Sequence, residues 1–289
     1  MTAFLTHGYV TIAGAIPPAT VAAYTASLWP RLHASPTDRS TWTRERTFLP
    51  ASRHEPLSTF APAAWGAACD LLGGAGLVET AHASDAFIVN LGVPGSTPCA
   101  TGRSLGGELW DWNVDGAEFV HFLDSREQAL LAVPVFADVA PGGGATMVAP
   151  DGIARVARHL WAHPEGVQPR FSADGRRGWF VEQARACARF AELTAHRGDV
   201  VLVHPFMLHS ASRNWARVPR VIANVRVALK RPFAYGRDGS ALSLVEQKTL
   251  MALGLDSLGG WCIAGVRRAI VPERVRKLRE EDERRKAAV

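Results

Sequence analysis

The segment Trp112-Asn113-Val114-Asp115-Gly116 places a carboxamide and a carboxylate two residues apart. If this segment is extended, the side chains of Asn113 and Asp115 point to the same face of a strand. Together with one donor from a second strand, they could occupy one triangular face around a metal ion and leave its other positions open. The 2-His-1-carboxylate site of non-haem iron(II) oxygenases has this arrangement. The pair therefore suggests metal chemistry.

A third donor and an anion-binding cation are available in residues 198–229, GDVVLVHPFMLHSASRNWARVPRVIANVRVAL. His204 and His209 are the candidate donors. Arg220 begins an expected strand, and an arginine there could pair bidentately with a small dicarboxylate beside the metal. On an unbroken strand, three later residues would share a face with Arg220: Ile222, Asn224 and Arg226.

Short β-branched runs bounded by glycine, proline and aspartate predict the strands that would position these side chains. They cover residues 85–93, 129–139, 198–204 and 220–230. Short strands with long connections favour a jelly roll or barrel over a βαβ sheet. Glycine-rich APGGGATM, after the second run, is expected to be a tight turn.

Two helices are expected before the strands, at residues 17–28 and 61–72. Pro17 and Pro18 suit the first turn of a helix. The periodicity puts two sets of residues on helix faces: Val21, Tyr24 and Leu28, and Trp65, Cys69 and Leu72. Between the helices, residues 33–56 have no clear period and are predicted to be a loop. The basic tail pairs Glu280 with Arg284 and Glu281 with Arg285 at helical spacing, which predicts a solvated helix.

Composition narrows the functional classes. The 289 residues are 47% hydrophobic and 20% charged, with a net charge of +5. Basic residues are mixed with acidic ones, which argues against a nucleic-acid-binding arm. No apolar run is long enough for a membrane span, and the start lacks the pattern of a signal peptide, so a cytoplasmic location is expected. The four cysteines form no CxxC pair and are expected to be buried thiols.

In order and spacing, FLTHGYVTIAGAIPP, residues 114–153 and GDVVLVHPFMLHSAS resemble the phytanoyl-CoA dioxygenase family of iron(II)/2-oxoglutarate oxygenases. The resemblance covers most of the chain and implies a double-stranded β-helix that binds Fe(II) and 2-oxoglutarate. It assigns Asp115 and His209 as metal ligands and Arg220 as the residue that binds the 2-oxoglutarate carboxylate. Ala211 stands where the family often has a serine, and neighbouring Ser212 is expected to contribute to the cosubstrate site.

Asn113 stands where the family has the first histidine ligand. A carboxamide oxygen is a weaker donor to iron(II) than an imidazole nitrogen, so Asn113 is expected to ligate weakly or to orient a water. Three interpretations stay open: an oxygenase with an altered ligand set, a metal-independent isomerase or cyclase, or a ligand-binding protein. Because Asp115 is retained, halogenation is not expected. Asp111 could replace a ligand only if the strand register slipped.

Other histidines have less specific settings. His121 would face the same side as Asp115 on an unbroken strand and is a candidate substrate-pocket residue, as is Asn224. His204 is either a structural residue or a reserve ligand and pocket residue. His159 and His163 have the i,i+4 spacing of a zinc-binding helix, but Leu160 replaces the glutamate of a metalloprotease, so surface positions on an amphipathic helix are expected.

We therefore predict one domain over residues 1–289: a mainly β, double-stranded β-helix with N-terminal helices and a helical tail from about residue 265 to 289. The predicted function is Fe(II)- and 2-oxoglutarate-dependent oxidation of a small molecule, without nucleic-acid or membrane partners.

Overall fold

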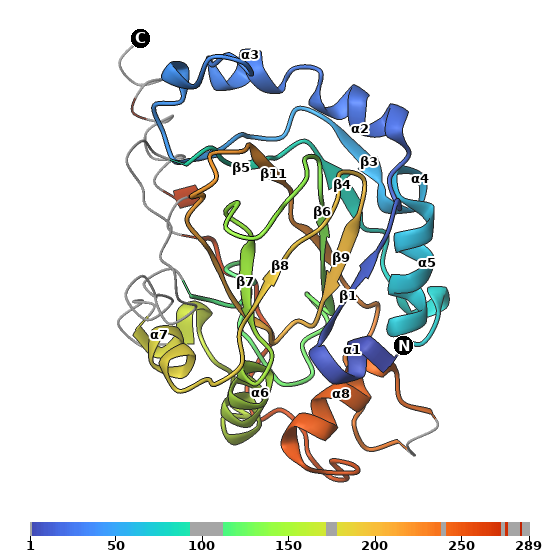
Figure 1. Ribbon diagram of the computed structural model, residues 1–289. Coiled ribbons are helices and arrows are strands. Elements are labelled where there is room, and N and C mark those ends of the chain that lie inside the picture. The colour runs from blue at the N-terminus through green and yellow to red at the C-terminus, as the bar shows by residue number, and fades with distance from the viewer. Residues whose placement is uncertain are drawn as a thin grey trace.

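The computed structural model describes residues 2–92, 112–171, 178–237 and 241–272, with residues 275, 276 and 284. It combines antiparallel β-sheets with flanking helices (Figure 1). Helices are as prominent as strands, so the fold is mixed rather than mainly β as predicted. None of the helices in these ranges is long and apolar enough to cross a membrane.

The largest sheet has four strands in the order β1 (Tyr9–Ile12), β9 (Val200–Val203), β6 (Leu130–Pro134) and β12 (Val225–Val227). All of its pairings are antiparallel. Strands β6 and β9 are buried along their whole length, because both of their faces are covered.

A second sheet has the order β10 (Leu208–Ala211), β7 (Thr146–Ala149) and β8 (Ala191–Leu193). A third has the order β11 (Arg220–Ile222), β5 (Ile88–Asn90) and β2 (Arg46–Phe48). A bridge between Val135 and Ile222 joins this third sheet to the largest one. The remaining pair is β3 (His54–Pro56) with β4 (His82–Ser84).

The order of the strands along the chain alternates between these sheets. Strand β5 pairs in the third sheet, Asn113 bridges to the second, β6 lies in the largest, and β7 and β8 return to the second. Strands β9, β10 and β11 then alternate in the same way. This pattern is compatible with a double-stranded β-helix.

Helices surround the sheets (Figure 1). Helices α2 (Pro18–Thr25) and α3 (Leu28–Leu32) lie near β5 and β11, and α4 (Leu57–Phe60) and α5 (Pro62–Leu71) lie beside β1 and β9. At the opposite end are the remaining four: α1 (Thr2–His7), α6 (Gly152–Ala162), α7 (Gly178–Arg185) and α8 (Leu244–Leu253). In the described part of the chain, short 3-10 turns cover Arg39–Thr41, Ala75–Leu77 and Pro169–Phe171.

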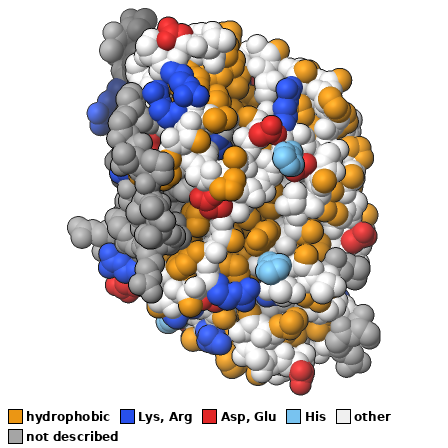
Figure 2. Space-filling model, viewed as in Figure 1, with side chains coloured by type: hydrophobic (Ala, Val, Ile, Leu, Met, Phe, Trp, Pro, Cys, Tyr) orange, Lys and Arg blue, Asp and Glu red, His pale blue; other side chains and the backbone are white. Residues whose placement is uncertain are grey.

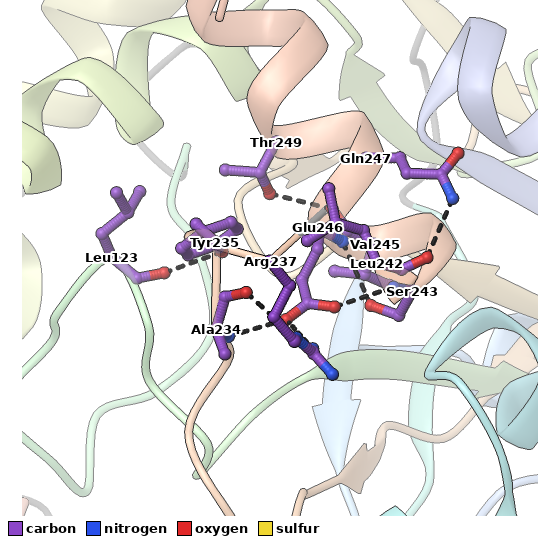
Figure 3. Close-up of polar contacts among 10 residues, drawn as sticks. All are labelled: Leu123, Ala234, Tyr235, Arg237, Leu242, Ser243, Val245, Glu246, Gln247 and Thr249. Carbon is purple, nitrogen blue, oxygen red and sulfur yellow. Dashed lines mark hydrogen bonds and ion pairs between the residues drawn. The ribbon is translucent and has the colours of Figure 1, made fainter. Parts of the chain in front are cut away.

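The start of α8 is fixed by a buried carboxylate (Figure 3). The Ser243 hydroxyl accepts from the Glu246 backbone N–H, and Glu246 Oε2 accepts from the Ser243 N–H at 2.8 Å, which is a capping box. Glu246 Oε1 also accepts from the Ala234 N–H at 2.7 Å and from Arg237 Nη2 at 2.6 Å. These contacts hold the chain after β12 against the helix that covers one end of the sheets.

The predicted helix faces are largely confirmed. Val21, Tyr24 and Leu28 are buried together, although the helix ends at Thr25 and a second one begins at Leu28. Cys69 and Leu72 are also buried, whereas Trp65 is only partly covered. The four predicted strand runs contain β5, β6, β9 and the pair β11 and β12.

Several predictions about local structure are wrong. Residues 33–56 contain β2 and β3, which are too short for sequence periodicity to reveal. Residues 220–230 form two strands, not one, because β11 pairs with β5 whereas β12 pairs with β6. Of the predicted tail helix, described residues 265–272 are not helical, whereas Val275, Arg276 and Arg284 are helical as predicted. Most of the rest of the predicted tail helix, including its two ion pairs, lies outside the described residues.

The cysteines are less uniform than predicted. Cys69 is buried, but Cys187 is partly exposed and Cys262 is exposed, and all three are free thiols. Cys99 lies outside the described residues.

On the face shown in Figure 2, basic and acidic side chains are interspersed among hydrophobic areas.

Candidate functional site

Asn113 forms an isolated antiparallel bridge with His209 of β10, so the two residues lie directly opposite each other. The Asn113 N–H donates to the His209 carbonyl at 2.9 Å, and the His209 N–H donates back to the Asn113 carbonyl at 3.0 Å. Directly opposed residues of an antiparallel pair project their side chains to the same face. The amide of Asn113 also reaches the His209 carbonyl, with Nδ2 at 3.4 Å.

Asp115 completes a cluster with His209. Oδ1 of Asp115 is 3.6 Å from Nε2 of His209, and the two side chains are 27% and 13% exposed. His209 Nδ1 is 3.0 Å from the Met207 carbonyl oxygen, which can only accept, so Nδ1 carries the proton. In the neutral ring, Nε2 therefore presents its lone pair toward the carboxylate.

The Asp115 carboxylate and the His209 imidazole have a spacing that a metal ion could bridge. A separation of 3.6 Å is too long for a hydrogen bond, but both atoms can reach one ion with bonds of about 2.1 Å. The Nδ1–H bond to a backbone carbonyl is the usual support of a metal-binding histidine. Two donors thus fit a metal ion. Within the described ranges, however, no group of three His, Cys, Asp or Glu residues is placed to hold one.

Asn224 forms a hydrogen bond with the Asp115 carboxylate. It lies between β11 and β12, where the chain changes partner strand, and its Nδ2 donates to Asp115 Oδ2 at 3.2 Å. This contact occupies the carboxylate oxygen that faces away from His209. Oδ1 is consequently the oxygen directed at the imidazole.

Arg220 is a buried cation, 2% exposed. Its Nη2 donates to the Thr146 hydroxyl at 2.8 Å, but Nε and Nη1 have no hydrogen-bond partner within the described part of the chain. Burial, with a smaller contribution from Arg46, lowers the pKa of Arg220 to about 10, so the guanidinium is still charged at neutral pH. A buried charge with unpaired donors is costly, and an anion bound there would relieve that cost.

Strand register relates Arg220 to the Asp115–His209 pair. Thr146, which contacts Arg220, is opposite Ala211, and Val148 is opposite His209. Ala211 and His209 are two residues apart and share a face, so the Arg220 contact lies about 7 Å along the ladder from His209. The other face of β10 is closed, since Leu208 packs against α6. A small dicarboxylate could therefore extend from Arg220 toward His209.

Two other predicted site residues make structural contacts. The Ser212 hydroxyl donates to the Ala145 carbonyl at 2.7 Å. It is therefore bonded to the backbone just before β7 rather than to Arg220. His121 is not on an unbroken strand with Asp115, because Gly116 turns the chain with a φ of 114°. His121 is buried, and its Nε2 is 2.6 Å from the Gly116 carbonyl oxygen. Burial lowers the pKa of His121 to about 4.

His204 is buried, with 1% of its surface exposed, and both of its ring nitrogens form hydrogen bonds. Nδ1 accepts from the Phe206 N–H at 3.1 Å, which leaves Nε2 to donate to the Thr249 hydroxyl at 3.1 Å. The ring therefore links the end of β9 to α8. His159 is only half-buried, stacked against Phe171. His163 lies just beyond the end of α6 rather than within it.

Sequence reasoning missed Thr146, Asn90 and Arg46. Thr146 and Asn90 lie near the ends of their strands, and nothing local distinguishes them from ordinary strand residues. Arg46 lies in the segment predicted to be a loop, although Arg44, Arg46 and Phe48 alternate with other residues as in a strand. That alternation was the one available signal. Asp111, the possible alternative ligand, lies outside the described residues.

Comparison with known proteins gives weak likenesses only. No family model and no curated protein matches the sequence. Among solved structures, the chain is similar to the non-heme alpha ketoglutarate dependent epimerase SnoN from nogalamycin biosynthesis, with 17% identity and a TM-score of 0.40. That alignment covers 79% of this chain and 80% of SnoN.

Two further structures are similar to a comparable degree. The non-heme monooxygenase ThoJ, in a nickel complex, has 16% identity and a TM-score of 0.43, over 82% of this chain and 80% of ThoJ. AviO1 from Streptomyces viridochromogenes Tue57 has 14% identity and a TM-score of 0.44, over 80% of this chain and 96% of AviO1. Likenesses of this strength assign neither a family nor a reaction.

Proposed function

We propose that this protein is an iron(II)/2-oxoglutarate-dependent enzyme that oxidises a small-molecule substrate, built on a double-stranded β-helix like that of the phytanoyl-CoA dioxygenase family. The observation that carries the proposal is the buried Arg220 guanidinium, with Nε and Nη1 unpaired, on the ladder that also bears His209. A carboxylate bound there would accept charge-assisted hydrogen bonds from the guanidinium. The neighbouring Asp115–His209 pair supplies two metal donors.

Each residue of the candidate site has a distinct role in this proposal. Asp115 and His209 would hold the metal, and Asn113 would ligate weakly or orient a water molecule. Arg220 and Thr146 would bind the distal carboxylate of 2-oxoglutarate, since the Thr146 hydroxyl accepts from Arg220 and keeps its own proton to donate. Bound iron with 2-oxoglutarate would supply the oxidising chemistry.

A second candidate function uses the anion-binding site at Arg220 without a metal ion. It is favoured by Asn113, because a carboxamide at the third position is a poor substitute for an imidazole. In this alternative, the protein is an isomerase or cyclase that binds an anionic ligand at Arg220, or a protein that only binds such a ligand.

Anaerobic titration of the purified protein with iron(II) and 2-oxoglutarate tests the proposal. A saturable visible charge-transfer band is expected, together with release of succinate once oxygen and a substrate are supplied. Arg220→Ala should lose 2-oxoglutarate binding. If activity on a substrate survives chelator and the absence of oxygen, the non-oxidative alternative replaces the oxygenase. If Arg220→Ala binds 2-oxoglutarate normally, the assignment of Arg220 is wrong.

A further inference from the structure

Two arginines occupy one row of the third sheet. In β5, Asn90 is opposite Arg220 of β11 on one side and opposite Arg46 of β2 on the other. Directly opposed residues across antiparallel strands project to the same face, so all three side chains lie on one side of this sheet. Arg46 is partly buried, and Asn90 and Arg220 are buried.

That side is the one directed at the proposed site. The Asn90 amide donates to the Ser212 carbonyl at 3.0 Å, just beyond the end of β10, and Arg220 reaches Thr146 on β7. On the opposite face, the neighbouring Val89 and Val221 are packed in the hydrophobic core. Arg46 therefore lies on the same side of this sheet as Arg220, in the row that Asn90 connects to the segment after β10.

The row contains two arginines. Arg46 is close enough to add to the effect of burial on the pKa of Arg220, and no carboxylate among the described residues forms an ion pair with Arg220. Glu45, next to Arg46 in the chain, projects to the other face by strand alternation. Two like charges in one row disfavour each other, and an anion that interacts with both lowers that cost.

We propose that Arg46 and Arg220 form a two-arginine site that binds a small dicarboxylate without any metal ion. The inference rests on the proposed function in naming 2-oxoglutarate as the natural ligand. Arg220 has unpaired donors on both edges of its guanidinium, since Nε and Nη1 lie on different edges, and one bidentate carboxylate covers only one edge. Arg46 supplies a second cation for the same dianion.

This arrangement would also compensate for Asn113. Where a third protein ligand is weak, chelation of the metal contributes less to cosubstrate binding, and the arginine pair contributes more. The dicarboxylate would then bind before the metal ion. The bound dicarboxylate would in turn change the affinity of the site for the metal, which is a coupling between the two ligands.

Calorimetric titration of the full-length protein with 2-oxoglutarate and with succinate, in excess EDTA, tests the inference. Saturable binding of both is expected in the wild type. Arg46→Met, which keeps the apolar stem, should weaken it at least about tenfold, the usual loss for a charge-assisted hydrogen bond. Arg220→Met should abolish it. Arg158→Met is the matched control, because Arg158 is exposed on α6 and the variant has the same net charge.

The outcomes separate this inference from the proposed function. Binding that requires iron would overturn metal independence while leaving the oxygenase proposal intact. Wild-type affinity in Arg46→Met, or an equal loss in Arg158→Met, would overturn the role of Arg46. Arginine-dependent binding in EDTA with no charge-transfer band on adding iron would support the inference and count against the oxygenase. Because Arg46 is on an edge strand and only partly buried, its variant is expected to fold, which circular dichroism would verify.

Discussion

Asn113 and His209 exchange both backbone hydrogen bonds across an isolated antiparallel bridge, at 2.9 and 3.0 Å. In such a pair the Cα atoms are about 5.5 Å apart and the side chains lie side by side. An imidazole at position 113 would therefore stand next to that of His209. The identity of this one residue decides whether the cluster has two strong metal donors or three.

Asn113→His is expected to raise iron(II) affinity about tenfold or more, because it adds a nitrogen donor to the Asp115–His209 pair. Anaerobic competition with a chelator of known affinity measures the change. Asn113→Gln is the control, since it keeps a carboxamide and should show no gain. Unchanged affinity in the histidine variant would mean that residue 113 does not face the ion.

Asn224→Ala is expected to weaken metal binding by about 10-fold, because the carboxylate of Asp115 loses the contact that orients it. The same competition assay applies, with Arg226→Ala as control: Arg226 is exposed on β12, two residues further along. Asn224→Asp should weaken binding further, since a second carboxylate would repel Asp115 in the absence of metal. Equal affinities in all four proteins would show that Asp115 needs no such support.

Thr146→Val is expected to lower both stability and 2-oxoglutarate affinity, because Arg220 would lose its one observed acceptor. A buried donor left unsatisfied costs about 1–3 kcal/mol, which urea unfolding would detect. Thr146→Ser keeps the hydroxyl and should recover most of the loss. If valine and serine behave alike, the hydroxyl contributes nothing and the defect is one of packing.

His204 makes stability depend on pH. Burial, with Lys248 contributing less, lowers the pKa of His204 to about 3. An unfolded histidine titrates near 6.5, so the unfolded state binds more protons between these values. The stabilising effect of the neutral ring is complete above about pH 6.5 and declines as pH falls toward 3.

His204→Asn tests this, since its side-chain oxygen can accept from the Phe206 N–H as Nδ1 does. The variant should be less stable at pH 7 and should lose less stability between pH 6.5 and 4.5, where one such histidine accounts for about 1.4 kcal/mol per pH unit. Urea unfolding at several pH values measures the slope. A slope identical to that of the wild type would mean that other groups control acid unfolding.

Local sequence signals were sufficient for much of the framework. Apolar runs located β5, β6 and β9, because buried strands need continuous β-branched residues. The same signals failed for β2, whose three residues span less than two periods. They also joined β11 to β12, since nothing in residues 220–230 marks a change of partner strand.

The candidate site shows the same division. Residue types nominated Asp115 and Arg220 and left His204 and His209 as alternative donors. The resemblance to the phytanoyl-CoA dioxygenase family then selected His209. Their relationships required the fold: Asn113 and His209 are 96 residues apart in sequence, and Thr146 and Arg220 are 74 apart. The six-residue separation of Asp115 and His121 predicted a shared face only for an unbroken strand, and Gly116 turns the chain between them.

By itself, the sequence determined which side chains could do chemistry and where extended segments lie, since both follow from residue type and short-range periodicity. Only the tertiary structure decided that Arg220 is buried with unpaired donors, that Arg46 lies in its row, and that Asn224 holds Asp115. The physical reason is that strand pairing and register are set by packing across the whole chain, and a shift of one residue would turn each of these side chains to the opposite face.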